Sequence, residues 1–169
     1  ALTKLNIVDI AYNLFSRTSL PSSLYTSPSL TTLEAGGNYW DGTIPEALFD
    51  KTTLTGLNLE RTYLSGTISP LFAQLTGLQK LYLQHSSFTG TIPYQMKALT
   101  NLRVLNFDAT SMTGVVHLFE FQESETLYMF NVMNNNFNCY SACWTDEVEL
   151  IYQDGDSDSN VPSCAACPE

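Results

Sequence analysis

A phrase of hydrophobic residues and glycine recurs along this chain at an interval of 24 residues. The copy that starts at Leu54 continues through Leu57, Leu59, Leu64, Gly66 and Ile68, and the next through Leu78, Leu81, Leu83, Phe88, Gly90 and Ile92. A unit this short cannot bury its own apolar face, so repeats with a fixed period of about 20 to 50 residues stack on one another. The repeat therefore predicts a solenoid with one coil for each copy.

The repeat extends over most of the chain. Its copies start at Leu5 (a degenerate copy), Leu30, Leu54, Leu78, Leu102 and Leu127. The copy at Leu102 has lost the proline and runs one residue longer, and the last copy breaks at Cys139. We predict a solenoid domain of about six repeats over residues 1–138, with the first and last incomplete or degenerate. Residues 139–169 are predicted to form a cysteine-bearing acidic cap.

Each part of the phrase predicts a local structure. The segment LxxLxL alternates as a β-strand does, so its leucines enter the core and the residues between them face outward. Asparagine at positions 13, 38 and 135, or Thr62, Ser86 and Thr110 in its place, is suited to hydrogen-bond the backbone where the strand ends. The glycine permits a tight turn, the proline fixes φ after it, and the LxxL that follows predicts a short helical or 3₁₀ turn.

Written in full as LxxLxLxxNxLxGxIPxxLxxL, the phrase resembles the plant-type leucine-rich repeat. This repeat occurs in the ectodomains of plant receptor-like kinases and receptor-like proteins, and in polygalacturonase-inhibiting proteins. The Gly-x-Ile-Pro element at residues 42–45 and 90–93 is the most specific part of the resemblance, which covers about residues 2–137. It implies a right-handed α/β solenoid with a parallel β-sheet on the concave face and short helical or 3₁₀ turns on the convex face.

Charge is distributed unevenly along the chain. All 7 Lys and Arg residues lie at or before Arg103, together with six of the 17 acidic residues, so the other eleven acidic residues follow with no basic residue among them. The formal net charge of −10 argues against nucleic acid and anionic membranes as partners. No run of 18 apolar residues exists, which predicts no membrane span in these residues. The chain starts inside a coil, so we expect either preceding residues or another subunit of an assembly to cover that coil.

The four cysteines lie where the repeat stops, at Cys139, Cys143, Cys164 and Cys167. Caps with paired cysteines are implied by the family resemblance, so we expect disulfide bonds formed in the secretory pathway or outside the cell. We expect the bridges to join the first pair to the second, in either the crossed or the nested arrangement. A zinc site built from all four thiolates is the alternative, because CxxxC followed by CxxC has metal-like spacing.

Carboxylates alternate between the two cysteine pairs, at Asp154, Asp156, Asp158 and the amide Asn160. Calcium loops often start in this way, but the twelfth position from Asp154 is Ala165, so the bidentate glutamate of an EF-hand is absent. The segment is therefore a weak calcium candidate, and a solvated acidic loop is the alternative. We expect no cofactor.

Residues between the core leucines should form columns on the concave face, with successive coils about 4.8 Å apart. These columns are polar and mixed in charge, with aromatic residues near the centre and toward the predicted cap, a composition that suits protein or peptide recognition. The predicted contact residues are Glu60, Arg61, Tyr82, Gln84, His85, Arg103, Asp108 and Tyr128.

Catalysis has little support, because the histidines are His85 and His117 and no nucleophile at a strained turn can be identified beside them. We therefore predict a non-enzymatic, extracellular domain that binds a protein or peptide through its concave face. A structural or docking subunit of a larger assembly or cell-surface coat is the main alternative. Two further possibilities are an inhibitor of a secreted enzyme and, from the repeated Thr43, Thr67 and Thr91, an ice-binding protein.

Overall fold

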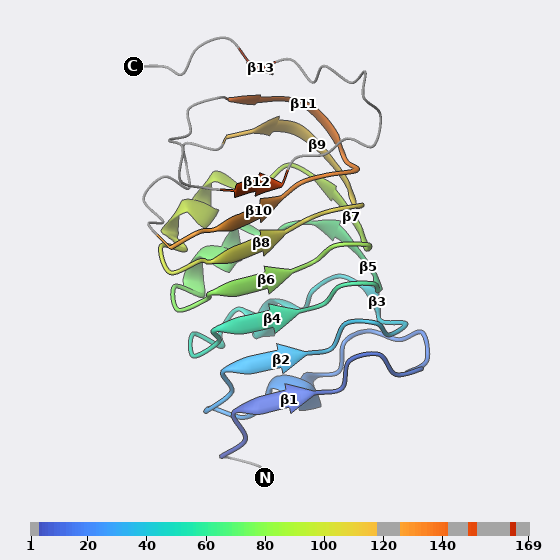
Figure 1. Cartoon of the computed structure of the whole chain (residues 1–169). Coiled ribbons are helices and arrows are strands. Elements are labelled where there is room, and N and C mark those ends of the chain that lie inside the picture. The colour runs from blue at the N-terminus through green and yellow to red at the C-terminus, as the bar shows by residue number, and fades with distance from the viewer. Residues whose placement is uncertain (1–3, 118–125, 142–148, 152–162, 165–169) are drawn as a thin grey trace.

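The computed structural model describes residues 4–117, 126–141, 149–151 and 163–164, and side chains within residues 4–117 and 126–138. The chain winds into stacked coils, most of which contribute one strand to each of two parallel sheets (Figure 1). The first sheet has seven strands: β1 (Ile7–Asp9), β2 (Thr32–Glu34), β4 (Gly56–Asn58), β6 (Lys80–Tyr82), β8 (Val104–Asn106), β10 (Met129–Asn131) and β12 (Glu149–Ile151).

Along the chain, each strand of the second sheet comes after a strand of the first sheet. Its six strands are β3 (Asp41–Gly42), β5 (Tyr63–Thr67), β7 (Ser87–Gly90), β9 (Ser111–Val116), β11 (Asn136–Ser141) and β13 (Ser163–Cys164). Residue Thr18 of the coil before β3 forms an isolated parallel bridge with Trp40.

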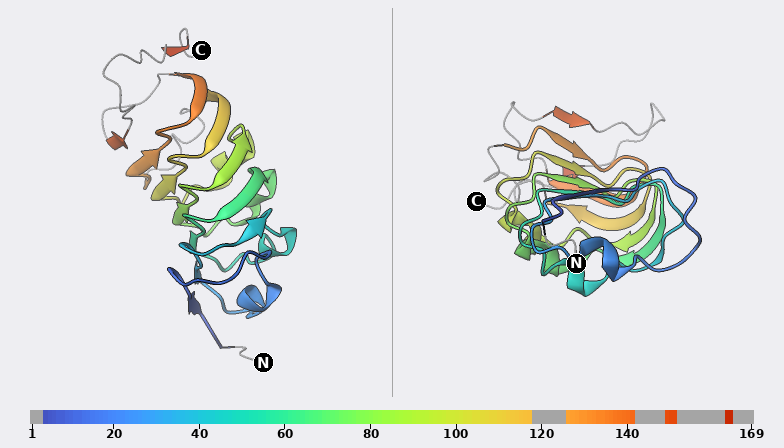
Figure 2. Two further views of the ribbon diagram at one scale, coloured as in Figure 1. Left: turned by 90° about the vertical axis from the view of Figure 1, so that its right-hand side faces the viewer. Right: turned by 90° about the horizontal axis from the view of Figure 1, so that it is seen from below.

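Short 3₁₀ helices close four of the coils: η1 (Ser22–Tyr25), η2 (Glu46–Leu48), η3 (Pro70–Gln74) and η4 (Tyr94–Ala98). Proline precedes or opens each of them, because its fixed φ suits the entry to a helical turn. In the left view of Figure 2 the first sheet lies along one side of the solenoid and the helices along the other, with the second sheet between them. The predicted 3₁₀ turns are therefore confirmed.

The core is a column of leucines that lie one above the next. Residues Leu33, Leu57, Leu81 and Leu105 are paired in register through β2, β4, β6 and β8, and all four are fully buried. Burying each such side chain contributes about 1.5–3 kcal/mol. Beneath the helices, Phe49 and Phe72 meet edge to face at 4.8 Å. The α/β solenoid predicted from the leucine repeat is confirmed.

The asparagine positions bond backbone carbonyl groups, as predicted. The Asn38 side chain is 1% exposed and its amide donates to the carbonyl oxygens of Ile10, Ala35 and Gly36 at 3.0–3.1 Å. The Asn135 amide makes three equivalent bonds, while the hydroxyl of Thr62 makes a single one of this kind, to the Leu59 carbonyl. The shorter side chains therefore replace the amide only in part.

The second sheet was not predicted. Along β5 a single core residue, Leu64, lies among exposed or half-buried neighbours, so the sequence shows no strand-like alternation. The pairing is made by backbone hydrogen bonds between coils, for which side chains give little signal.

Both sheets continue beyond Cys139, since β12 pairs with β10 and β13 with β11. The domain boundary at that residue stays a prediction. The side chains of the four cysteines, and the calcium candidate at residues 154–160, lie outside the part that the structure describes.

Candidate binding surface

The outward face of the first sheet, the predicted concave face, carries side chains in continuous columns. Strand register aligns Asp9, Glu34, Asn58, Tyr82 and Asn106. Beyond the strands, backbone bonds keep the coils aligned, among them those from Arg61 N to Gln84 O and from His85 N to Asp108 O, both 2.8 Å. The predicted columns are therefore continuous in the structure.

The outermost column has left-handed backbone conformation on every coil from β1 to β10. Five of its members are not glycine and have φ between 49° and 54°: Tyr12, Arg61, His85, Ala109 and Asn134. The sixth is Gly37, with φ 65°. Such a conformation costs a non-glycine residue on the order of 1 kcal/mol. The coil imposes it because the chain must turn at this point, and Gly37 and Asn134 are the members of the column whose residue type favours it.

The carboxylate of Glu60 lies at the centre of a hydrogen-bonded chain across the coils. The Tyr12 hydroxyl donates to Glu60 Oε1, and the Gln84 amide donates to Glu60 Oε2. The hydrogen bond to Glu60 is the largest of the effects that raise the pKa of Tyr12. Three coils are thereby joined by side chains alone.

Two glycines make room for this chain of contacts. A Cβ atom at Gly37 would lie 2.5 Å from Cδ1 of Tyr12, and one at Gly36 would lie 2.8 Å from Cγ of Glu60. The aromatic side chain of Tyr12 therefore lies over the backbone of the second coil, in space that the side chain of any larger residue at position 37 would fill.

Glu34 lies in an environment that disfavours its charge. Burial is the largest cause that raises its pKa, and the negative charges of Asp9 and Glu60 add to it, while a hydrogen bond from Asn58 and the charge of Lys80 oppose it. Among the described residues, no Lys, Arg or His nitrogen lies within 4.0 Å of the carboxylates of Asp9, Glu34 or Glu60. These three acids therefore gather negative charge at one end of the outward face.

His85 and Asp108 lie next to each other further along the face. The distance from His85 Nε2 to Asp108 Oδ2 is 3.7 Å, and the Asn134 amide donates to Asp108 Oδ1 at 2.7 Å. The side chain of Asp108 therefore lies within ion-pair distance of His85. This geometry fixes the two side chains as one polar unit.

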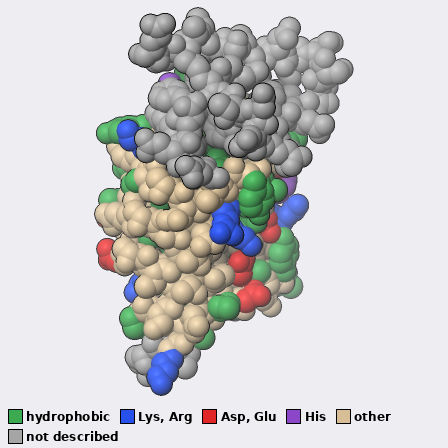
Figure 3. All heavy atoms as spheres, turned by 60° about the vertical axis from the view of Figure 1, so that its left-hand side comes forward, with side chains coloured by type: hydrophobic (Ala, Val, Ile, Leu, Met, Phe, Trp, Pro, Cys, Tyr) green, Lys and Arg blue, Asp and Glu red, His purple; other side chains and the backbone are tan. Residues whose placement is uncertain are grey.

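Aromatic and basic side chains lie at the end of β6 (Tyr82) and just before β8 (Arg103) and β10 (Tyr128). Tyr82 is half-buried, and burial raises its pKa. Arg103 and Tyr128 are exposed on successive coils, where the Tyr128 amide donates to the Arg103 carbonyl at 3.0 Å. Figure 3 shows charged side chains of both signs close to hydrophobic ones at the right of that view, below the part drawn in grey.

The eight predicted contact residues thus all lie along this one face, but their side chains differ in solvent exposure. Gln84 is only 9% exposed, and its Oε1 atom is buried. Two residues that the prediction left out also belong to the face: Tyr12 and Glu34. Extending the columns back into the degenerate first copy would have placed Tyr12 beside Gly37.

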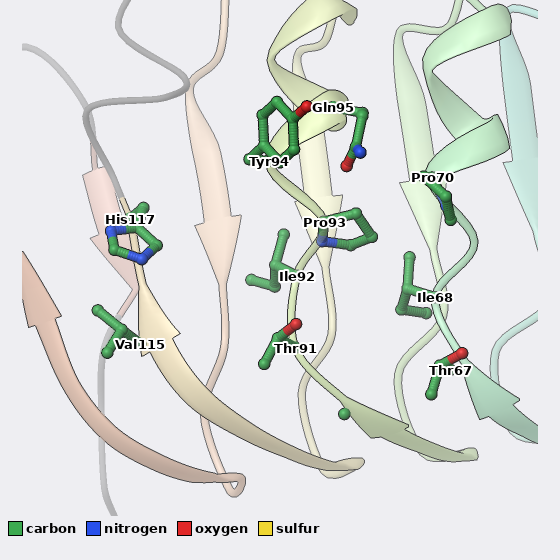
Figure 4. A pocket seen from close by; sticks show the side chains of 11 residues that line it. Thr67, Ile68, Pro70, Thr91, Ile92, Pro93, Tyr94, Gln95, Val115 and His117 are labelled. Atoms are coloured by element: carbon green, nitrogen blue, oxygen red, sulfur yellow. The ribbon is translucent and has the colours of Figure 1, made fainter.

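A hollow lies at the carboxyl ends of β5, β7 and β9, beside η3 and η4 (Figure 4). It measures about 660 Å³ and is lined mainly by hydrophobic groups, including Ile68, Ile92, Pro93, Tyr94 and Val115. No residue predicted to contact a partner lines it. The hollow is therefore separate from the outward face of the first sheet.

Comparison with known proteins finds no matching family model and no match among curated proteins. Solved structures do resemble the chain. The plant peptide hormone receptor RGFR1 in complex with RGF2 is 25% identical with a TM-score of 0.75, over 80% of this chain and 21% of that one. The PEPR1–AtPEP1 complex is 30% identical with a TM-score of 0.71, over 77% of this chain and 18% of that one.

A bacterial structure shares the fold as well. A leucine-rich repeat protein of Leptospira interrogans is 21% identical with a TM-score of 0.72, over 82% of this chain and 34% of that one. The chain therefore spans about a fifth of each plant receptor chain and a third of the bacterial one. Within the described residues, no helix has the length and apolar character needed to cross a membrane.

Proposed function

We propose that this chain, which has the fold of the plant-type leucine-rich repeat, is a recognition domain that binds a protein or peptide through the outward face of its first sheet. One observation carries the proposal: the sheet register holds polar and aromatic side chains in unbroken columns over successive coils. A partner that lies across the coils would meet side chains already in place.

The rigidity of the outward face supports this proposal. The columns are fixed by the buried leucine core below them, by backbone bonds between coils, and by side-chain bonds such as those at Glu60 and Asp108. A surface that is ordered before binding loses little conformational entropy when it docks. Tyrosine and arginine, which dominate the energetics of many interfaces, are exposed at Arg61, Arg103 and Tyr128.

The solved structures support the same class of partner. The names of two of them describe complexes, of RGFR1 with RGF2 and of PEPR1 with AtPEP1, and the first is called a peptide hormone receptor. We infer an extracellular or secretory location for this chain by likeness to such receptors and from its four cysteines. A non-enzymatic role belongs to the same proposal.

The proposal is tested in two stages: peptides that bind the chain are selected first, and variants of the chain then locate their binding site. A library of random 12-residue peptides displayed on phage is selected on the full chain, and the affinity of the selected peptides is measured by calorimetry. The double variant Arg61→Ala, Tyr82→Ala should bind them at least about tenfold more weakly, because contacts at a binding centre each contribute about 1 kcal/mol or more. Its melting temperature should stay close to that of the parent chain.

A matched control lies on the opposite side of the solenoid. Tyr94 and Lys97 form an exposed cation–π pair on η4, with the Lys97 ammonium 5.9 Å from the ring centroid. The double variant Tyr94→Ala, Lys97→Ala removes the same kinds of side chain and should leave affinity unchanged. Equal affinity of the parent and the Arg61, Tyr82 variant for every selected peptide would refute the proposal.

A further inference from the structure

We propose that the second-sheet face, the outward side of β3, β5, β7 and β9, binds an extended neutral polysaccharide such as a β-1,4-linked glucan across the coils. This face is separate from the one assigned to a protein or peptide, so the two proposals stand independently. Three features of the described residues lead to the inference: an exposed pair of aromatic rings, a guanidinium group held beside them, and rows of hydroxyl groups.

Two tyrosines form an exposed aromatic platform on this face. Tyr39 and Tyr63 occupy equivalent positions of successive coils, 24 residues apart, and are 44% and 47% exposed. Their ring centroids lie 5.9 Å apart, with an angle of 40° between the ring planes. This separation is close to the length that one pyranose unit adds to an extended glycan. The C–H groups of successive sugars can therefore pack on successive tyrosine rings, while the phenol hydroxyl groups stay in water.

Arg17 is held beside this platform by two contacts. Its Nε donates to Asp41 Oδ2 at 2.7 Å, and its guanidinium carbon lies 4.9 Å from the ring centroid of Tyr63. Asp41 Oδ1 accepts a further bond from the backbone amide of Gly42 at 2.7 Å. The hydrogen bond from Arg17 is the largest of the effects that lower the pKa of Asp41. At neutral pH both partners are therefore ionised, and the pair has no net charge.

The terminal nitrogens of Arg17 remain available to a partner. Among the described residues neither of them has a hydrogen-bond acceptor, and the side chain is 66% exposed. Their N–H groups can donate to the hydroxyl oxygens of a sugar that lies on the tyrosine rings. Because Asp41 balances the charge, this guanidinium group offers directed hydrogen bonds with little net attraction for anions.

Hydroxyl groups continue the face beyond the tyrosines. Strand register places Ser65 beside Ser87, and in the same way it places Thr67 beside Thr89. Asp41 alone is charged among the residues of β3, β5, β7 and β9, all of which the structure describes. A face of hydroxyl groups whose charge is already paired is complementary to a partner that is itself neutral and rich in hydroxyl groups.

Contacts between coils fix the threonine side chains. The methyl groups of Thr67 and Thr91 lie against Gly90 and Gly114 of the next coil, where a Cβ atom would be 3.0 Å and 2.6 Å from them. Both threonines are exposed, and within the described residues their hydroxyl groups make no hydrogen bond. These hydroxyl groups are thus ordered before binding, so that little entropy is lost when they bond a sugar.

The repeat of the face matches a polymer better than a single small molecule. Coils are spaced about 4.8 Å apart, so equivalent groups recur at nearly the interval of one sugar unit. A row of threonines by itself also fits an ice surface, the possibility raised from the sequence. Ice offers no C–H groups to aromatic rings, whereas a glycan does, so Tyr39 and Tyr63 favour the glycan.

The direct test compares three hexasaccharides. The ¹⁵N-labelled full chain is titrated with cellohexaose, which should cause saturable shifts at the amide signals of Tyr39, Gly42 and Tyr63. Isomaltohexaose has the same glucose units in flexible α-1,6 linkage. It should bind at least about tenfold more weakly, because its units do not meet successive coils together. Hexagalacturonic acid carries a carboxylate on each unit and should also bind more weakly, since Asp41 already pairs Arg17.

Variants of the chain locate the glycan. The double variant Tyr39→Ala, Tyr63→Ala should bind cellohexaose at least about tenfold more weakly, because both rings of the platform are lost. Tyr63→Phe keeps the ring and should bind within about twofold of the parent chain. The matched control Tyr94→Ala removes an exposed tyrosine from η4 and should leave the affinity unchanged. Amide spectra that are otherwise unaltered show that each variant is folded.

Four outcomes would overturn the glycan site. The first is an absence of saturable shifts with cellohexaose at its solubility limit, and the second is equal binding of all three hexasaccharides. The third is a set of cellohexaose shifts confined to the first sheet. The fourth is slowing of ice recrystallisation by the parent chain and the double variant alike, which would assign the threonines to ice. Binding of library peptides to the first sheet is measured separately, so either proposal can fail without the other.

Discussion

At the scale of single residues, several positions of the outward face have features that lower the stability of the folded chain. Glu34 is a carboxylate whose burial and acidic neighbours disfavour its charge. Gln84 holds a buried oxygen without a donor, and Tyr12, Arg61 and His85 have left-handed backbone conformation. Unfavourable positions that gather on one face are expected where a surface is shaped for binding.

Replacing Glu34 by Gln should stabilise the chain at neutral pH. The pKa of Glu34 in the folded state is raised above its ordinary value of 4.5, so the folded state holds a proton more tightly than the unfolded state. Its favourable contribution is fully present below pH 4.5 and is lost as pH rises through the folded pKa. The variant should therefore have the higher melting temperature at pH 7, and the difference should shrink toward pH 3.

Thermal unfolding followed by circular dichroism at pH 3, 5 and 7 measures this effect. The matched control is Glu46→Gln, which removes an exposed carboxylate on η2. It should shift the melting temperature little at any of the three pH values. A melting temperature of Glu34→Gln below that of the parent chain at pH 7 would show that Glu34 is stabilising as an anion.

At the scale of elements, the strands of the second sheet depend on glycine at the point where the backbone has positive φ. Gly66, Gly90 and Gly114 have φ between 78° and 89°. In addition, each lies against a threonine of the preceding coil, since a Cβ atom at Gly90 would be 3.0 Å from Cγ2 of Thr67. The glycine of one coil and the threonine of the coil before it therefore form one contact that repeats along the stack.

Gly90→Ala should destabilise the chain by at least about 1–2 kcal/mol, because alanine resists positive φ and its methyl group would press on Thr67. Gly77→Ala is the matched control. Its Cβ atom would lie 3.5 Å from the Leu54 carbonyl oxygen, an ordinary contact, and its φ is not in the left-handed region. Urea unfolding should show no loss of stability for Gly77→Ala, and equal losses for both variants would refute this account of Gly90.

At the scale of the whole molecule, stability is distributed along one axis. Each coil contacts its neighbours and little else, so the chain approximates a linear array of coupled units. The strand leucines of the coils that contain β4 and β6 (Leu57, Leu59, Leu81 and Leu83) are fully buried. The coil that contains β1 carries exposed Ile7, Tyr12 and Leu14, with 59%, 65% and 82% exposed surface.

Hydrogen exchange should reveal this gradient. We expect the amides of β4 and β6 to be protected at least about tenfold more strongly than those of β1, because local opening is easier where fewer apolar groups are buried. Exchange followed by NMR or mass spectrometry measures the difference directly. Uniform protection from β1 to β6 would mean that the stack opens only as one cooperative unit.

Much of the fold can be predicted from the sequence, and the reason is the repeat. Leu57, Leu81 and Leu105 recur because each coil must bury the same face against the next, so periodicity alone predicts the solenoid, its leucine core and the outward columns. Asn38 and Gly90 were also correctly interpreted, since each has a specific backbone role that few other residues can fill. These features are repeated locally and are therefore visible in the sequence.

Only the tertiary structure decided the rest. The second sheet is made by backbone bonds between coils, which leave no side-chain pattern. The contact of Tyr12 with Glu60 joins residues two coils apart across Gly37, and the crowding of Glu34 with Asp9 and Glu60 depends on side-chain reach and burial. The sequence determined which residues share a face because that follows from the period, whereas contacts among them follow from distances that exist only once the coils are stacked.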